Sequence, residues 1–198
     1  DRNGQQGRNH RAEEHAADLL AALHGISASF FGHERDTLIG PLHQPNPQTD
    51  HWLPFFRDHR LLYMGRVAHD AGRLAPATLS RLERLCARLD DWLEEPPAPS
   101  LLHGDVWGGN VLPRGARIAA FIDPAIYHGH AEVELAYTTM FNTFGRRFFD
   151  RYHEHRPIAP GFFETRLPLY HLYPLLVHAA LFGGGYGRQV EDILRRYI

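Results

Sequence analysis

One short stretch of the chain, residues 100–124, has the pattern of β structure, and it limits the possible folds more than any other feature. Short apolar runs at Leu101–Leu102, Val111–Leu112 and Ala119–Ile122 alternate there with turns that contain glycine. On both sides of this stretch, apolar residues recur at the period of a helix. We therefore predict a mainly α domain with a small β-hairpin element around residues 100–124 and no five-stranded sheet.

The flanking segments are predicted to be helices because their apolar residues recur every three or four positions. Pro168 and Pro174 should kink or interrupt the helix that contains them. Residues 30–48 contain two glycines and three prolines and follow no sustained period, so we expect a structured loop there. The expected helices are Arg11–Gly25, Trp52–Gly72, Pro76–Trp92, His130–Phe144, Arg146–Glu154, Phe162–Phe182 and Arg188–Tyr197.

The composition is that of one globular domain, since 198 residues with 43% hydrophobic side chains suffice for one core. A net charge of −2 gives no general attraction to nucleic acid or to an anionic membrane, so neither partner is expected. Residues 1–10 are polar, and we expect a disordered or frayed N-terminus there. The lone Cys86 cannot form an internal disulfide, and no hydrophobic signal core is present, so we expect a cytoplasmic location.

Three polar residues within and just after the β stretch have the spacing of a phosphoryl-transfer site. Asp105 and Asn110 lie five positions apart in a glycine-rich loop, and Asp123 ends the next apolar run. Phosphoryl transfer needs a carboxylate that orients and deprotonates the attacking hydroxyl, and oxygen ligands that hold Mg²⁺ on the phosphates. Each residue alone is also a common turn residue. Together and in this order, they favour a phosphotransferase.

These residues resemble the catalytic-loop Asp, the catalytic-loop Asn and the metal-binding Asp of the protein-kinase-like superfamily. The loop HGDVWGGN at residues 103–110 is similar to the fructosamine kinase form, and IDPAIYHGHAEVELAYT at 122–138 is similar to the metal-site stretch of that family. Residues 36–63 and 172–187 resemble two further signatures. The resemblance covers residues 11–198 and implies the C-terminal, catalytic lobe of an aminoglycoside-phosphotransferase-like kinase.

The resemblance implies an ATP- and Mg²⁺-dependent enzyme that phosphorylates a ketosamine, or fructosamine, at the sugar O3 and so deglycates the amine. Asp105 would be the base that receives the sugar hydroxyl, and Asn110 and Asp123 would be the metal ligands. His103 and Gly104 would shape the loop. The expected partners are ATP and a ketosamine, either a small molecule or a glycated protein.

Two further residues are candidates for sugar binding. Trp107 lies beside the base and could be a platform for the sugar ring, with burial in the core as the alternative. Glu132 and Glu134 follow Asp123 at a helix start, where carboxylates are favourable in any case, and Glu132 is a candidate substrate ligand. Gly183–Gly187 is predicted to be a turn between helices, because no strand precedes it and no lysine follows it.

All 21 basic residues of the chain are arginines, so the sequence contains no lysine. Kinases of this superfamily have a β-rich N-terminal lobe with a glycine-rich loop and a lysine on the phosphates, and arginine does not reproduce that lysine. We therefore expect an incomplete kinase that lacks the N-terminal β lobe, has no nucleotide-binding residues beyond the metal ligands, and has little activity by itself.

Two other functions remain open. A phosphotransferase for an aminoglycoside, choline or a similar alcohol would use the same base and metal ligands. A catalytically silent sugar-binding lobe would keep the groove without the chemistry, although such a lobe would have no chemical reason to retain Asp105, Asn110 and Asp123 together.

Overall fold

A computed structural model describes the backbone of residues 2–198 and the side chains from residue 10 onward. Helices dominate the fold, and three two-stranded antiparallel sheets lie among them. The helices are α1 (Arg2–His24), α2 (Trp52–Phe56), α3 (Tyr63–Asp70), α4 (Pro76–Cys86), α5 (Ala131–Met140), α6 (Arg146–His155), α7 (Leu167–Phe182) and α8 (Tyr186–Leu194). The strands are β1 (Thr37–Ile39), β2 (Leu42–Gln44), β3 (Ser100–Leu102), β4 (Val111–Arg114), β5 (Arg117–Phe121) and β6 (Tyr127–Gly129).

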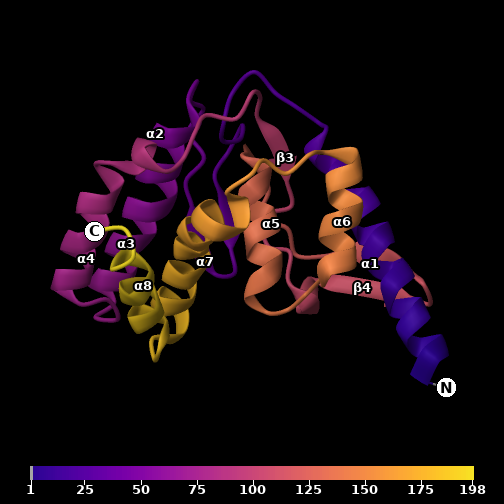
Figure 1. Ribbon diagram of the computed structural model, residues 1–198. Helices are drawn as coiled ribbons and strands as arrows, with labels where there is room; N and C mark the ends of the chain where they lie inside the picture. The colour runs from indigo at the N-terminus through magenta and orange to yellow at the C-terminus, as the bar shows by residue number, and fades with distance from the viewer. Residues whose placement is uncertain (1) are drawn as a thin grey trace.

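The helices form two groups with α5 and α7 between them (Figure 1). On one side α1 packs along α6, and on the other side α3, α4 and α8 pack together against α7. One continuous apolar core joins both groups, and it contains Leu20, Trp52, Phe148 and Leu176, each with no exposed surface. Among the described residues, no helix is long and apolar enough to cross a membrane.

The strand prediction was correct for one sheet and missed parts of the other two. The expected hairpin is β4–β5, in which Val111 pairs with Phe121. However, β3 pairs with β6, beyond residue 124, and a further hairpin, β1–β2, lies in the segment that was predicted to be a loop. The strands β1, β2, β3 and β6 are each only three residues long, too short to show a period in the sequence.

Two helix predictions can be compared with the structure. The helix predicted over Phe162–Phe182 is interrupted near Pro168, where the π-helical segment Phe162–Arg166 is followed by α7, and Pro174 lies inside α7 without ending it. The helix α1 begins at Arg2, although residues 1–10 were predicted to be frayed, and Asp1 lies outside the described residues. Because helix propagation costs little once a packed turn has formed, polar residues can extend a helix that its apolar end nucleates.

The buried Arg60 holds the β1–β2 segment against the helical core. Arg60 lies in the π-helical segment η1 (Arg57–Leu62), between α2 and α3, and its guanidinium donates to the carbonyl oxygen of Pro45 at 2.7 Å and to Oδ1 of Asn46 at 2.6 Å. The guanidinium also lies 4.0 Å from the ring centroid of Tyr127 on β6. Arginine suits this position because its planar fork reaches several acceptors and stacks on a ring at the same time.

Replacement of Arg60 by lysine is expected to lower the free energy of unfolding by about 2–4 kcal/mol, because an ammonium cannot satisfy the separated acceptors that the guanidinium reaches. Urea denaturation followed by circular dichroism measures this change. The matched control is Arg84→Lys on the exposed face of α4, where we expect a change within about 0.5 kcal/mol. An equally small effect at Arg60 would contradict the role of this residue.

Candidate functional site

The loop that follows β3 holds Asp105 by both of its carboxylate oxygens. The side-chain Nδ2 of Asn110 donates to Oδ2 and to the backbone carbonyl of Asp105, each at 2.9 Å. The Tyr137 hydroxyl, on α5, donates to Oδ1 of Asp105 at 2.5 Å. Each carboxylate oxygen keeps a further lone pair. The partly buried carboxylate is therefore fixed in place and can still accept a proton from another group.

The surroundings of Asp105 increase its basicity. Burial raises its pKa, and the hydrogen bonds from Tyr137 and Asn110 limit that rise because they stabilise the ionised form. Burial and the neighbouring carboxylate also raise the pKa of Tyr137, so its hydroxyl remains a proton donor. A positioned carboxylate with a raised pKa is suited to act as a general base.

The β4–β5 hairpin brings Asp123 to the same end of the loop as Asn110. Val111 pairs with Phe121, and the backbone N–H of Ile122 donates to the carbonyl oxygen of Asn110 at 3.0 Å. Asp123 is exposed and has a φ of 52°, in the left-handed region that non-glycine residues seldom adopt. Such backbone conformations concentrate at functional sites. The structure thus gathers Asp105, Asn110 and Asp123 in one place.

The donor atoms at this place suit a magnesium ion. Asn110 uses its NH₂ group on Asp105, which leaves Oδ1 as an acceptor, and the Asp123 carboxylate has no hydrogen-bond partner among the described side chains. Mg²⁺ prefers such oxygen ligands and usually completes its shell with water and substrate phosphates. Within residues 2–198, no group of three or more His, Cys, Asp or Glu side chains could hold a metal ion. Asn110 and Asp123 would supply some of the oxygen ligands of Mg²⁺, and phosphate oxygens or water would supply the rest.

Gly104 allows two backbone segments of the site to approach closely. It has a φ of 87°, and a Cβ at this position would lie 2.1 Å from the carbonyl oxygen of Ala125. The N–H of Ala125 donates to the carbonyl oxygen of His103 at 2.8 Å, which ties the segment after Asp123 to the loop. The His103 ring is buried, and its Nδ1 accepts from the N–H of Asp105 at 3.3 Å. His103 and Gly104 therefore have the contacts of loop-shaping residues.

A second support for this segment, Gln44 on β2, was not predicted from the sequence. Its buried side chain donates to the carbonyl oxygen of Ala125 at 3.0 Å and accepts from the Tyr173 hydroxyl at 2.6 Å. The residues that make these bonds are separated by 81 and 129 positions in the chain. Local patterns do not report pairings over such separations. The missed β1–β2 hairpin thus contributes directly to the geometry around Asp123.

A buried carboxylate, Glu134 on α5, anchors the backbone of the catalytic loop. It accepts from the N–H groups of His103 and Gly104 at 3.1 and 2.6 Å, and from Nε2 of His24 at 2.8 Å. His24 in turn bonds the Tyr152 hydroxyl at 2.7 Å. Burial alone would raise the pKa of Glu134, but the hydrogen bonds from His24 and Gly104 and the charge of His24 hold it below its ordinary value. Glu134 therefore positions the loop.

The two candidate sugar-binding residues lie in different surroundings. Trp107 is 40% exposed, beside Phe141, and so is not a core aromatic. Glu132 is buried and binds the Arg166 guanidinium through both oxygens at 2.7 Å. It lines a separate cavity of about 750 Å³ whose lining does not include Asp105, Asn110 or Asp123. Glu132 therefore lies apart from Asp105, Asn110 and Asp123. Its carboxylate is also already bound by Arg166.

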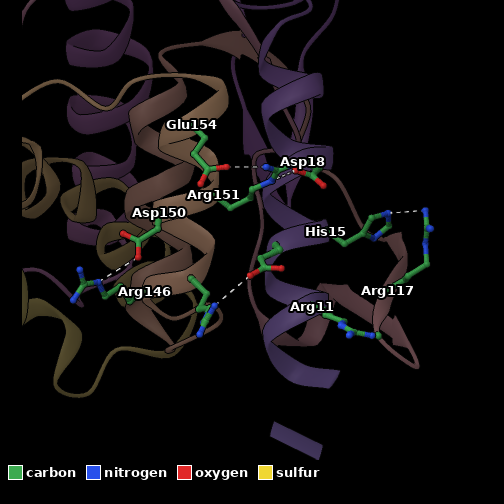
Figure 2. Close-up of a pocket in the computed structure, with 11 residues that line it drawn as sticks. Arg11, His15, Asp18, Arg117, Arg146, Asp150, Arg151 and Glu154 are labelled. Atoms are coloured by element: carbon green, nitrogen blue, oxygen red, sulfur yellow. Dashed lines mark hydrogen bonds and ion pairs between the residues drawn. The ribbon is translucent and has the colours of Figure 1, made fainter. Parts of the chain in front are cut away.

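A pocket of about 950 Å³ lies elsewhere, between α1, α6 and the β4–β5 turn (Figure 2). Charged side chains line it and largely pair with one another. Arg151 bonds Asp18 at 2.7 Å, and Arg146 lies 3.3 Å from Asp150. Exposed ion pairs of this kind contribute little individually. Because Asp105, Asn110 and Asp123 are not among the lining residues, we assign this pocket to a surface ion-pair network between two helices.

Comparison with known proteins identifies the family of the chain. The sequence model of the family described as "Fructosamine kinase" matches residues 4–198. A "probable ketoamine kinase" of Synechocystis is 38% identical over 191 residues, which cover 95% of this chain and 63% of that protein. A Thermobifida fusca crystal structure, named as a fructosamine-3-kinase, superposes with a TM-score of 0.88 at 37% identity and covers 94% of this chain and 64% of that one.

A more distant likeness in fold extends to an aminoglycoside phosphotransferase, solved as a ternary complex with AMP-PNP and hygromycin B, at a TM-score of 0.59 and 20% identity. These structural likenesses place the chain in the class of proteins with a kinase-like fold. Within that class, the chain belongs to the fructosamine kinase family. It spans somewhat less than two thirds of the length of the Synechocystis relative.

Substitution of Glu134 by glutamine is expected to lower the free energy of unfolding at neutral pH by about 2–4 kcal/mol, because it breaks a buried charged network. Folding lowers the pKa of Glu134 below its ordinary value of 4.5. The ionised carboxylate therefore stabilises the folded state at pH values above 4.5, and this stabilisation is lost as the pH falls from 4.5 through the lowered pKa. The variant should lack that acid-dependent part. Urea titrations at several pH values test this, with the exposed Glu164→Gln as control. Parallel pH curves for wild type and Glu134→Gln would contradict the assignment.

Proposed function

We propose that this chain carries the catalytic base and the metal ligands of an ATP-dependent kinase that phosphorylates the O3 hydroxyl of a ketosamine. The observation that carries the proposal is the arrangement of Asp105, which is held by Asn110 and Tyr137 at the end of the hairpin that bears Asp123. Family membership supports kinase chemistry. The names of the relatives, a ketoamine kinase and a fructosamine-3-kinase, support the substrate class and the position of transfer.

In this mechanism Asp105 accepts the proton of the sugar hydroxyl while its two hydrogen bonds keep the carboxylate aligned with the attacking oxygen. Orientation matters most, because the transition state of phosphoryl transfer is loose and asks little of a base beyond positioning. Asn110 and Asp123 would hold Mg²⁺ on the phosphate oxygens, and the ion would neutralise their charge. Trp107, exposed beside Asp105, would support the sugar ring, as the sequence suggested.

The outer face of the β4–β5 hairpin offers a place for the nucleobase. Leu112 pairs with Ala120, and because side chains alternate along a strand, Ile122 lies on the same face as Ala120. Leu112 and Ile122 are both exposed apolar side chains, and Ile122 directly precedes Asp123 in the chain. An apolar surface beside a metal site suits the flat ring of a nucleotide, whose phosphates would then reach Asn110 and Asp123.

The proposal includes two lobes with different roles, as the sequence indicated. Residues 11–198 would form the catalytic lobe, and the lysine that pairs with the phosphates in kinases of this class would come from an N-terminal lobe, since the chain has no lysine. Without that clamp a phosphate tail lacks both neutralisation and orientation. We therefore expect residues 1–198 alone to transfer phosphate far more slowly than an ordinary kinase.

The test is phosphorylation of a fructosamine by this chain joined to the N-terminal lobe of the Thermobifida relative. We expect Asp105→Asn to reduce turnover by about 10²- to 10⁴-fold, because it removes the base and leaves shape and binding intact. The control is Asp150→Asn, an exposed carboxylate on α6 that lies outside the site, and it should retain full activity.

Three results would contradict the proposal. Undiminished turnover in Asp105→Asn would exclude the assigned base. A strong preference for an aminoglycoside or choline over every fructosamine would favour the other alcohol phosphotransferases. Sugar binding without any phosphate transfer, in a fusion that binds ATP, would favour a catalytically silent lobe.

A further inference from the structure

A row of aromatic rings extends from the base toward the C-terminal helices. The Trp107 ring lies 6.0 Å from that of Phe141, and Phe141 lies 5.2 Å from the ring of His178 on α7. His178 in turn lies 5.7 Å from Phe182 and 5.0 Å from Tyr186, at the start of α8. These five residues are called the aromatic row below. Four separate segments contribute to it, so it is a product of the tertiary fold.

The aromatic row is exposed to an extent that packing does not require. Trp107 is 40% exposed, Phe141 is 38% exposed and Phe182 is 66% exposed. Single exposed apolar residues are common on protein surfaces, but contiguous apolar patches often mark binding sites. Because three of the five rings of the aromatic row are exposed to solvent, the row is better explained as a binding surface than as part of the core.

The aromatic row begins at the candidate base. The ring of Phe141 lies 6.4 Å from the ring of Tyr137, whose hydroxyl donates to Asp105. Trp107 follows Asp105 by two positions in the same loop. A molecule that presents a hydroxyl to Asp105 would therefore have its other end within reach of the row.

His178 provides a polar group within this apolar surface. Its Nδ1 lies 2.7 Å from the carbonyl oxygen of Pro174, which can only accept, so Nδ1 carries the proton. In the neutral ring Nε2 then has a free lone pair and acts as an acceptor. An acceptor beside three aromatic rings, Phe141, Phe182 and Tyr186, favours a ligand that is a cation with N–H donors, because the faces of such rings are electron-rich.

We propose that the aromatic row beyond Trp107, from Phe141 to Tyr186, is the subsite for the amino nitrogen of the ketosamine and for the substituent that this nitrogen carries. Nε2 of His178 accepts a hydrogen bond from the secondary ammonium group, the neighbouring rings stabilise its charge, and Phe182 covers the substituent. This inference rests on the proposed function. In a ketosamine only three carbon atoms separate the nitrogen from O3, so one substrate molecule can contact both Asp105 and the aromatic row.

This arrangement explains how the site could distinguish a ketosamine from a plain sugar. The hydroxyls of a ketose gain nothing from ring faces, whereas a cation near an aromatic ring is stabilised, and more strongly where water is excluded. The outer hairpin face, with Leu112 and Ile122, is the proposed place of the nucleobase and belongs to different elements. The nucleobase, the phosphates and the sugar are each assigned to other residues. The substituent on the nitrogen is the part of the substrate that would occupy the aromatic row beyond Trp107.

The experiment measures binding of three probes to the chain of residues 1–198 by calorimetric titration. They are 1-deoxy-1-benzylaminofructose, its methylamino analogue, and 1-O-benzylfructose, in which oxygen replaces the nitrogen. We expect the wild type to bind the benzylamino probe about tenfold more tightly than the ether. His178→Leu should remove most of this preference. The matched control is His51→Leu, at an exposed histidine whose side chain makes no capping bond, and it should keep the preference.

Phe182→Ala is the second variant, and because its side chain is exposed it should not disturb folding. It should weaken the benzylamino probe by about fivefold and leave the methylamino probe nearly unchanged. Equal binding of the amine and the ether by the wild type, or an unchanged preference in both variants, would overturn the inference while the Asp105→Asn result still stands. If no probe binds and the fusion phosphorylates only other alcohols, the proposed function itself fails.

Discussion

The buried carboxylate of Glu134 is the interaction on which the rest of the structure depends. A charged group without water must have its acceptor positions filled, and here the loop backbone fills them. Because the N–H groups of His103 and Gly104 bind one oxygen each and His24 binds as well, the loop cannot move without exposing a buried charge. Through His24 and Tyr152, the same network ties α1 and α6 to α5.

A single helix therefore sets both the backbone of the loop and the orientation of its base. Tyr137 lies three positions after Glu134 on α5, close to one helical turn, so both side chains point toward the loop. Glu134 holds the backbone before Asp105, and Tyr137 holds the carboxylate itself. Asn110 holds the other carboxylate oxygen of Asp105 through its NH₂ group, and its own side-chain oxygen remains available to a metal.

Residues whose chemistry is local could be predicted from the sequence, and residues whose role depends on distant partners could not. Asp105, Asn110 and Asp123 could be proposed as one site because their spacing within one loop and one hairpin is short, and the structure places them close together. In contrast, His24 and Glu134 are 110 positions apart, and nothing near either residue indicates the pairing.

Glu132 is a second residue whose role depends on a partner that is distant in the sequence. Its place at a helix start made it available for a substrate, but Arg166, 34 positions later, binds its carboxylate instead. The short strands β1, β2, β3 and β6 were missed or placed incompletely because their pairing partners, and not their own residues, determine them. The helices were predicted well apart from the start of α1, because the spacing of apolar residues along a helix follows directly from which of its faces is buried.

The central claim is that the base and the metal ligands form one site at the end of the β4–β5 hairpin. The most direct measurement is paramagnetic broadening by Mn²⁺, used in place of Mg²⁺, in the amide spectrum of the chain. We expect the amides of Asn110 and Asp123 and their neighbours to broaden first, and Asp123→Asn to abolish this effect. Broadening confined to the carboxylates between α1 and α6, Asp18 and Asp150 among them, or an unchanged response in Asp123→Asn, would contradict the account.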